Sequence, residues 1–308
     1  MAVLRIQVLS GPHADVAAGR LRELDSAGML AVTVGDQPAA VALVVGIRTD
    51  ARAARSADVV LDDRQPLVAQ ADRLWAERLE PFARRMAGSG RAKPGPPALR
   101  PHDPRLPDAA QRMLGRIRSG LTSRGLDDGR WTYDHIGSTA VPGLRAKPFI
   151  DLQLGAVSVP EEGSPVDDVL AAAGFVPARG ARPDSPGVDW DEIRVPGLAP
   201  AEAYRKRLYV RYDPGQPAIL HVRRLGAPWW SYTVQFRDWL RADPAGRRAY
   251  EEMKQRAADA HAGDGDFDDY TRAKTAFFDR VQGEYGQIAP HHDDPSGPVT
   301  RPGRRDEE

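Results

Sequence analysis

The segment from His135 to Leu154, HIGSTAVPGLRAKPFIDLQL, constrains the fold more than any other part of the chain. Its end belongs to the apolar run FIDLQLGA, which predicts a strand over residues 149–156. Because side chains alternate between the two faces of a strand, Asp151 and Gln153 fall on one face and the apolar residues fall on the other. The chain therefore carries a carboxylate on a strand that follows a glycine–serine turn.

The residue types in this segment are those that bind phosphate and a divalent cation. A glycine beside a small hydroxyl residue lets backbone N–H groups approach phosphate oxygens, so Gly137 and Ser138 predict a phosphate-binding turn. A carboxylate at Asp151 is suited to hold Mg²⁺ against a phosphate group. Lys147 is placed to add a cationic contact to phosphate, and His135 is placed to line the same pocket.

The same residue types also have structural interpretations. Glycine–serine pairs occur in many turns that bind nothing. An isolated aspartate in an apolar strand is costly unless it is paired, so Asp151 is either partnered, by Lys147 or Arg145, or functional. His221, in the run AILHVRR, lies among residues suited to a strand, where a histidine is more often a hydrogen-bonded structural residue than a catalytic one.

Hydrophobic periodicity around this segment predicts a mixed sheet with flanking helices over residues 101–286. Strands are expected at 131–136, 149–156, 208–212 and 218–224, and helices at 107–123, 166–173, 231–242, directly after Asp243-Pro244, and at 267–285. Asp243 is a helix-capping residue type and Pro244 suits a first helical turn, so this pair predicts a helix start.

Residues 1–90 predict a separate, small α/β unit. Strands are expected at 3–9, 29–34, 41–47 and 57–62, and helices at 14–27 and 65–86. Most of these strands are short apolar runs rich in β-branched residues, typical of strands buried on both faces of a parallel sheet. Arg78, on the apolar stripe of the second helix, is expected to extend its charge to solvent.

Two segments predict irregular structure. The Gly- and Pro-rich stretch at 91–100 predicts a linker between the two units. Residues 287–308 lack periodicity and predict a disordered tail. The run His291-His292-Asp293-Asp294 resembles a metal-ligand set, but we expect no metal site on such a tail.

Composition excludes several classes of function. The 43 basic residues balance the 43 acidic ones, so no overall field attracts nucleic acid or an anionic membrane, and we expect neither as a partner. The absence of cysteine excludes thiolate catalysis and disulfides. Because no apolar run reaches the roughly 18 residues that span a bilayer, we expect a cytoplasmic protein.

The string HIGSTAVPGLRAKPFIDLQLG resembles the signature of the GrpB family, as do AILHVRR, FRDWLRADP and AKTAFFD, and the similarity covers residues 98–286. The resemblance implies a minimal nucleotidyltransferase fold, in which Gly137 and Ser138 match the phosphate-facing turn and Asp151 matches the first metal carboxylate. It also implies three pocket-lining residues, namely His135, Lys147 and His221.

Residues 51–90 resemble the end of dephospho-CoA kinases, which some bacteria carry fused ahead of a GrpB domain. Such kinases hold phosphates on a P-loop, GxxxxGK followed by Ser or Thr. The corresponding segment here, LSGPHADVAAGR, keeps Ser10-Gly11 but has no Lys-Ser or Lys-Thr pair, so ATP binding is not expected there. We interpret residues 1–90 as a degenerate kinase-like region that serves docking or stabilisation and is the surface for any protein partner.

These features favour an enzyme-like module that binds a nucleotide or a phosphorylated metabolite. If it is catalytic, Mg²⁺ on Asp151 would serve nucleotidyl or phosphoryl transfer, with His135 or His221 relaying a proton. Gln153 stands where an active nucleotidyltransferase has a second carboxylate, which argues against the usual two-metal catalysis. The alternatives are a non-catalytic binding or chaperone-like module and a dephospho-CoA kinase, the latter disfavoured by the missing P-loop.

Overall fold

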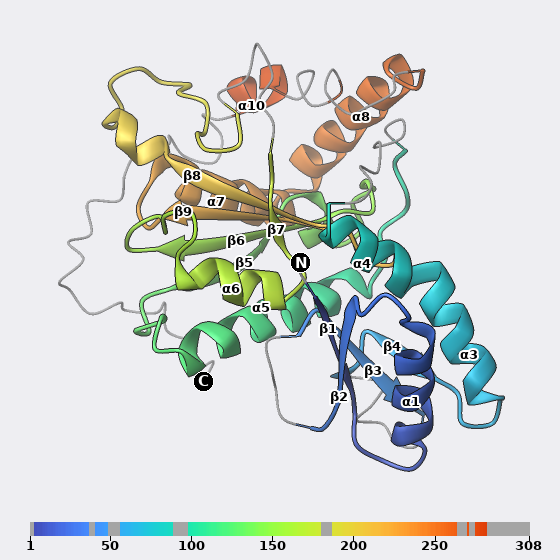
Figure 1. The fold of residues 1–308 in the computed structure, drawn as a ribbon. Helices are drawn as coiled ribbons and strands as arrows, with labels where there is room; N and C mark the ends of the chain where they lie inside the picture. The colour runs from blue at the N-terminus through green and yellow to red at the C-terminus, as the bar shows by residue number, and fades with distance from the viewer. Residues whose placement is uncertain are drawn as a thin grey trace, which may run out of the picture.

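The chain forms two sheets, one in each half, with helices packed against them (Figure 1). The computed structural model describes residues 3–36, 41–48, 56–88, 98–179, 187–263, 270 and 275–281. The expected α/β class is confirmed. The predicted tail at 287–308 and most of the predicted linker at 91–100 lie outside the described residues.

The first sheet is parallel throughout and has the strand order β2-β1-β3-β4. The elements of this half are β1 (Leu4–Val8), α1 (Ala14–Leu24), β2 (Leu30–Val34), β3 (Leu43–Ile47), β4 (Val59–Leu61), α3 (Leu67–Leu74), the π-helical turn Trp75–Leu79 and α4 (Glu80–Met86). Every residue of β3 is buried, as predicted. The prediction of burial on both faces is wrong for β2, because it is an edge strand whose residues are partly buried or exposed.

The second sheet is mixed and has the strand order β5-β6-β9-β8-β7. The elements of this half are α5 (Leu106–Ser123), β5 (Thr132–Ile136), the 3-10 helix Ser138–Ala140, β6 (Ile150–Ala156), α6 (Pro165–Ala172), β7 (Val176–Pro177), the 3-10 helix Ala201–Tyr204, β8 (Lys206–Arg211), β9 (Ala218–Arg224), α7 (Pro228–Ala242), α8 (Pro244–Ala260) and α10 (Thr275–Val281). Strand β6 pairs with β5 in antiparallel and with β9 in parallel orientation. Asp243 Oδ1 accepts a hydrogen bond from Ala245 N at 2.8 Å, which confirms the predicted start of α8.

The two faces of the second sheet have different surroundings. Leu152 and Leu154 pack with α5 and α6, which Figure 1 shows together on one side of the sheet. On the opposite face, Gln153 hydrogen-bonds to α7. Aromatic side chains of α7, α8 and α10 form a further cluster beyond that face. The alternation predicted for this strand is therefore confirmed, and Asp151 lies on the α7 side.

A buried carboxylate, Asp213, joins the two halves. It accepts hydrogen bonds from Arg78 Nε at 2.7 Å, from Arg78 Nη2 at 2.8 Å and from Arg211 Nη2 at 2.6 Å. Arg211 is fully buried and also donates to the carbonyl oxygen of Ala42, in the first half, at 2.7 Å. The prediction that Arg78 extends to solvent is wrong, because its guanidinium is held by this carboxylate 135 residues further along the chain.

Asp58 is a second buried carboxylate between the halves. It accepts hydrogen bonds from Arg116 Nη1 at 2.9 Å and Arg112 Nε at 3.2 Å, both on α5, and from the Val44 N–H at 2.9 Å. Burial alone would raise the pKa of this carboxyl, but Arg116 and the other neighbouring donors hold the pKa below its ordinary value. If one half unfolded alone, the buried ion pairs between the halves would break and leave uncompensated charges in the other half. Because that is costly, we expect the two halves to unfold together.

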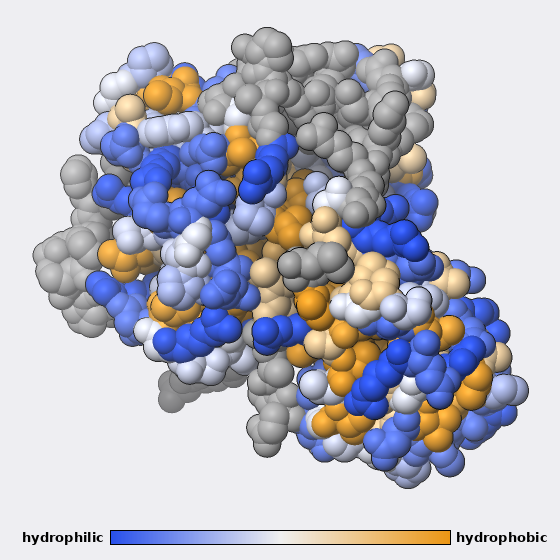
Figure 2. All heavy atoms as spheres, viewed as in Figure 1, coloured by the Kyte–Doolittle hydropathy of each residue, from blue (hydrophilic) through white to orange (hydrophobic). Residues whose placement is uncertain are grey.

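Within the part of the chain that the structure describes, no helix combines the length and the apolar character needed to cross a bilayer. Figure 2 shows hydrophilic and hydrophobic residues interspersed over the unit that carries α1 and α3. Val16 and Val68 are among the exposed apolar side chains there. Scattered apolar residues of this kind are ordinary on a protein surface.

Candidate functional site

The glycine–serine turn lies directly against the Asp151 side chain. Strand β5 ends at Ile136, which is paired with Asp151 of β6. Gly137 follows with φ +71° and ψ −170°, a backbone conformation essentially restricted to glycine. A Cβ added at Gly137 would lie 2.4 Å from Asp151 Oδ2. Glycine is therefore required both by the backbone and by the close approach of the carboxylate.

Two residues of α8 contact the Ser138 side chain. Lys254 Nζ donates to Ser138 Oγ at 3.3 Å and also donates to the carbonyl oxygen of Arg145. Tyr250, one helical turn earlier, hydrogen-bonds to Ser138 as well, and its ring centre lies 4.9 Å from Lys254 Nζ. Lys254 is 1% exposed, so a buried ammonium lies behind the turn.

Lys147 lies near the same group of residues. Its Nζ is 4.9 Å from the ring centre of Tyr270. Burial raises the pKa of the Tyr270 hydroxyl, and the nearby Tyr250 and Asp151 raise it further. Tyr270 therefore stays protonated at neutral pH, in the region that contains both Lys147 and Asp151.

Gln153 is fully buried, and its amide joins β6 to β9 and to α7. Its Oε1 accepts hydrogen bonds from Arg223 Nη1 at 2.7 Å and from Thr233 Oγ1 at 2.9 Å. Its Nε2 donates to the carbonyl oxygen of Trp230 at 3.1 Å. Both polar atoms of this amide therefore have protein partners.

Arg223 brings a guanidinium to this face of the sheet. Its Nε and Nη2 donate to the two carboxylate oxygens of Asp191 at 2.7 Å and 3.0 Å, and Lys206 Nζ donates to the same carboxylate at 2.8 Å. Burial alone would raise the pKa of Asp191, but these two cations hold the pKa well below its ordinary value. Two positive charges therefore surround one carboxylate next to Gln153.

His221 lies on the same face, because it is paired with Gln153 in the register of β6 and β9. Its Nδ1 is 3.2 Å from Arg223 Nη2. Burial and the charge of Arg223 lower the pKa of His221 well below its ordinary value. This histidine is therefore neutral at physiological pH, and its Nδ1 is the acceptor of the Arg223 hydrogen bond.

His135 points to the opposite face of the sheet from Asp151, because it is paired with Leu152. Its Nε2 lies 3.0 Å from Thr139 Oγ1. Burial, with the charges of nearby cations, lowers the pKa of His135 to about 4. Of the six predicted site residues, the structure thus brings Gly137, Ser138 and Asp151 into one group, with Lys147 in the same region. It places His221 on the same face of the sheet, one strand away, and separates His135.

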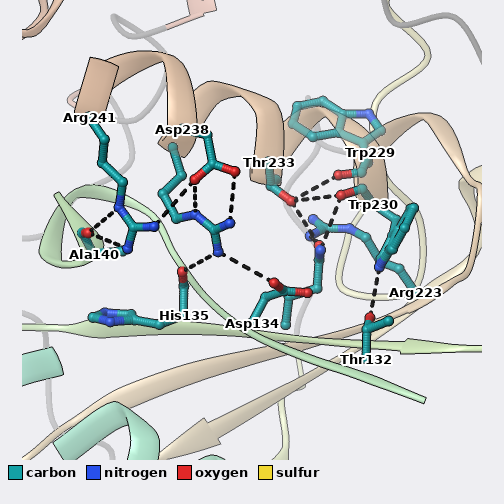
Figure 3. A network of polar contacts seen from close by, with 12 residues as sticks. Thr132, Asp134, His135, Ala140, Arg223, Trp229, Trp230, Thr233, Asp238 and Arg241 are labelled. Carbon is teal, nitrogen blue, oxygen red and sulfur yellow. Dashed lines mark hydrogen bonds and ion pairs between the residues drawn. The ribbon is translucent and has the colours of Figure 1, made fainter. Parts of the chain in front are cut away.

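Two arginines of α7 hold the backbone on either side of the turn (Figure 3). Arg241 donates from Nε and Nη2 to the carbonyl oxygen of Ala140 at 3.0 Å and 2.9 Å. Arg237 Nη1 donates to the carbonyl oxygen of His135 at 3.0 Å and lies 3.4 Å from Asp134 Oδ1. These contacts fix the turn between β5 and β6 relative to α7.

The side chains present do not fit a two-Mg²⁺ centre. No group of three His, Asp or Glu side chains gathers as a metal-ligand set among the described residues. Asp151 supplies one carboxylate, but Gln153, at the position expected to carry the second, already accepts two hydrogen bonds. Asp134, paired with Gln153 across β5 and β6, lies in an ion pair with Arg237. Because protein-bound Mg²⁺ is usually held by one or two carboxylates together with waters and substrate phosphates, the single carboxylate of Asp151 does not supply the ligands of two ions.

Lys254, Tyr250 and Arg223 were not predicted as site residues from the sequence. Tyr250 and Lys254 are four residues apart and share one face of α8 with the buried Ala257. A lysine on the buried stripe of an amphipathic helix is the signal that could have identified Lys254. Arg223 offers no comparable signal, because its partner Asp191 is 32 residues away in an irregular segment.

Comparison with known proteins relates this chain to two groups. The family model described as GrpB protein matches residues 96–284. The chain is 33% identical over 278 residues to a protein of Mycolicibacterium paratuberculosis named dephospho-CoA kinase, and the match covers 86% of this chain and 64% of that protein. It is 28% identical over 153 residues to the glutamate-rich protein GrpB of Alkalihalophilus pseudofirmus, covering 48% of this chain and 75% of that protein.

A solved structure also aligns with part of the chain. The crystal structure of conserved protein GrpB from Enterococcus faecalis has a TM-score of 0.42 and 22% sequence identity, and the alignment covers 61% of this chain and 96% of that chain. The chain spans only 64% of the length of the mycobacterial relatives.

Proposed function

Because the chain belongs to the GrpB family, we propose that its second half binds a nucleotide or another phosphorylated metabolite on the Gly137–Ser138 turn. The observation that carries the proposal is the buried ammonium of Lys254, 3.3 Å from Ser138 Oγ. Proteins bind phosphate oxygens with backbone N–H groups at glycine turns, with hydroxyl groups and with lysine. This turn combines all three, and Lys147 adds a second cation in the same region.

The proposed fold of the second half is of the nucleotidyltransferase type, as the resemblance of its central motif implies. A glycine turn followed by a strand with a carboxylate next to the turn is the arrangement that this proposal requires, and the close approach of Gly137 to Asp151 supports it. Binding is the function that the donor set supports best, because the Gln153 amide is occupied by protein partners. Nucleotidyl or phosphoryl transfer is the second candidate, favoured by the carboxylate of Asp151 against the turn.

For residues 1–90 we propose a stabilising function. The side chains of Asp58 and Asp213 connect this half to the second half through buried ion pairs. The activity in the name of the mycobacterial relative belongs to that protein. We do not extend it to this chain, because the segment from Leu9 to Arg20 has no Lys-Ser or Lys-Thr pair to hold a triphosphate.

A thermal-shift screen of the full chain against nucleotides, coenzyme A derivatives and sugar phosphates tests the proposal. A ligand that binds the folded state raises the Tm, by an amount that grows with the logarithm of the ligand concentration divided by Kd. For the best compound, calorimetry should show binding that Ser138→Ala weakens by about tenfold, the value of one hydrogen bond to a charged group. Ser158→Ala, at an exposed position after β6, is the matched control and should leave the affinity unchanged. If no phosphorylated compound raises the Tm, or if Ser138→Ala binds as tightly as the wild type, the proposal is wrong.

A further inference from the structure

We propose that the interface between the two halves binds an oxyanion, either free phosphate or the phosphate group of a small molecule, against Arg112 and Arg116 of α5. The inference is independent of the proposed function, because no residue of the Gly137–Ser138 turn takes part in it. It depends on three features of the interface, which are its excess of positive charge, a buried donor that has no acceptor, and a guanidinium that is open to solvent.

The buried ion pairs between the halves contain more positive than negative groups. Two carboxylates are shared by four arginines, namely Asp213 by Arg78 and Arg211, and Asp58 by Arg112 and Arg116. The two sets interact, because the charge of Arg211 also helps to lower the pKa of Asp58. These six side chains therefore carry a net charge of +2. Because a buried charge is costly unless an opposite charge compensates it, this excess favours an anion.

Arg116 has a buried donor without an acceptor. The residue is 8% exposed, and its two Nη atoms donate to the Asp58 carboxylate at 2.9 Å and 3.4 Å. Its Nε is buried and meets no acceptor within the part of the chain that the structure describes. The pKa of this guanidinium is lowered, because the charge of Asp58 does not fully offset burial and the charges of Arg211 and Arg112. An oxyanion beside Arg116 would supply both an acceptor and an opposite charge.

Arg211 offers a less suitable position for an anion. Its Nε also has no acceptor in the described ranges, but the residue is fully buried and its guanidinium lies 4.8 Å from the ring centre of Phe82. The face of an aromatic ring compensates part of such a charge. A Cβ added at Gly174 would lie 2.6 Å from Arg211 Nη1, so this side chain is tightly packed. We therefore place the anion on the α5 side of the interface.

Arg112 opens this side of the interface to solvent. Its side chain is 19% exposed, and its Nε donates to Asp58 Oδ1 at 3.2 Å. Its Nη1 and Nη2 are neither buried nor bonded to any acceptor among the described residues. Two N–H groups of one guanidinium form the fork that binds a phosphate or carboxylate group with two hydrogen bonds. Because Arg112 and Arg116 are one helical turn apart and flank the same carboxylate, an anion on Arg112 lies next to the charge of Arg116.

The position of this site differs from that of a nucleotide on a P-loop. Asp58 directly precedes β4, and its carboxylate accepts a hydrogen bond from the N–H of Val44, near the start of β3. The site therefore lies at the amino ends of these strands, whereas ligands of open parallel sheets bind at the carboxyl ends. An anion at the amino ends would reduce the repulsion among the arginines that join the halves, and would thereby stabilise their association.

Calorimetric titration of the full chain with inorganic phosphate, in chloride buffer of constant ionic strength, tests the inference. Phosphate should bind to Ser138→Ala, in which the other proposed site lacks its hydroxyl group. Addition of Arg112→Met to this variant should weaken binding by about tenfold or more, the value of one hydrogen bond to a charged group. Addition of Arg118→Met is the matched control and should leave the affinity unchanged, because Arg118 lies at an exposed position of the same helix.

The same titration with glucose 6-phosphate distinguishes the two sources of the oxyanion. Binding as tight as that of inorganic phosphate would identify the phosphate group of a metabolite as a ligand of the site. Weaker binding would identify free phosphate as the ligand.

The inference would be overturned if neither compound bound to Ser138→Ala, or if Arg112→Met left the affinity for phosphate unchanged. Neither result bears on the proposed function, which the thermal-shift screen tests separately. Should the variant with Arg112→Met not fold, as judged by circular dichroism, hydrogen–deuterium exchange of Ser138→Ala decides. Phosphate should then slow exchange at residues 107–117, in the first turns of α5, and unchanged exchange there would overturn the inference.

Discussion

Replacement of Gly137 by alanine tests the geometry of the turn, because two separate penalties fall on this residue. With φ +71° and ψ −170°, a residue that has a Cβ is strained by about 1–3 kcal/mol. The added Cβ would also lie 2.4 Å from Asp151 Oδ2 and 2.9 Å from Asp151 Cβ, and overpacking of this kind costs about 1–3 kcal/mol more. The free energy of unfolding should therefore fall by about 2–6 kcal/mol.

Urea denaturation followed by tryptophan fluorescence and far-UV circular dichroism measures this loss. Gly143→Ala is the matched control, because Gly143 has φ +77° but a Cβ added there meets no heavy atom of the described residues within 4 Å. The control should lose only about 1 kcal/mol, from backbone strain. Gly137→Ala should also cost less in an Asp151→Ala background, where the carboxylate is gone. Equal losses for Gly137→Ala and Gly143→Ala would refute the close approach of the turn to Asp151.

Three further predictions concern the interface between the halves, acid stability and the first half. Asp58→Asn leaves two arginines without their buried partner and should lower the free energy of unfolding, measured in urea, by about 3–5 kcal/mol. Asp168→Asn, at an exposed position, is the control and should lower it by less than about 1 kcal/mol. Equal losses of unfolding free energy in the two variants would contradict the buried interface. Because the pKa of His135 is about 4 in the folded state and about 6.5 in the unfolded state, its contribution to stability is complete above pH 6.5 and is lost as the pH falls toward 4. This contribution is about 3 kcal/mol. The urea midpoint of the wild type should therefore fall between pH 6.5 and pH 4, and His135→Gln should reduce this fall. An equal fall in the variant and the wild type would contradict the burial of His135. An assay of ATP-dependent phosphorylation of dephospho-CoA should give no product above the protein-free control, and measurable turnover would contradict the interpretation of residues 1–90 as a degenerate kinase-like region.

Local patterns were enough to predict the core of the fold. The alternation in FIDLQLGA determines which side chains of β6 face α7, because the period of a strand does not depend on its neighbours. Asp243 and Pro244 likewise mark the start of α8, because an N-cap depends on a few adjacent residues. The burial of β2 was mispredicted, because a strand sequence does not reveal whether the strand lies at an edge of its sheet.

The partners of the site residues depend on packing between distant segments. Lys254 of α8 contacts Ser138, which lies 116 residues earlier in the chain. The contacts of Gln153 depend on Arg223 and Thr233, which lie 70 and 80 residues further along the chain. Arg78 was expected in solvent because the carboxylate that pairs with it, Asp213, belongs to the other half. No local pattern contains this information.

The proposed function places a phosphorylated ligand at the Gly137–Ser138 turn. Hydrogen–deuterium exchange of the full chain, measured by mass spectrometry with and without saturating ATP, shows whether the ligand protects this turn. Ligand binding at the turn should slow exchange in the peptide that covers residues 136–147 and should leave residues 9–16, where a P-loop would lie, unchanged. Slowed exchange at residues 9–16, with no change at 136–147, would contradict the claim.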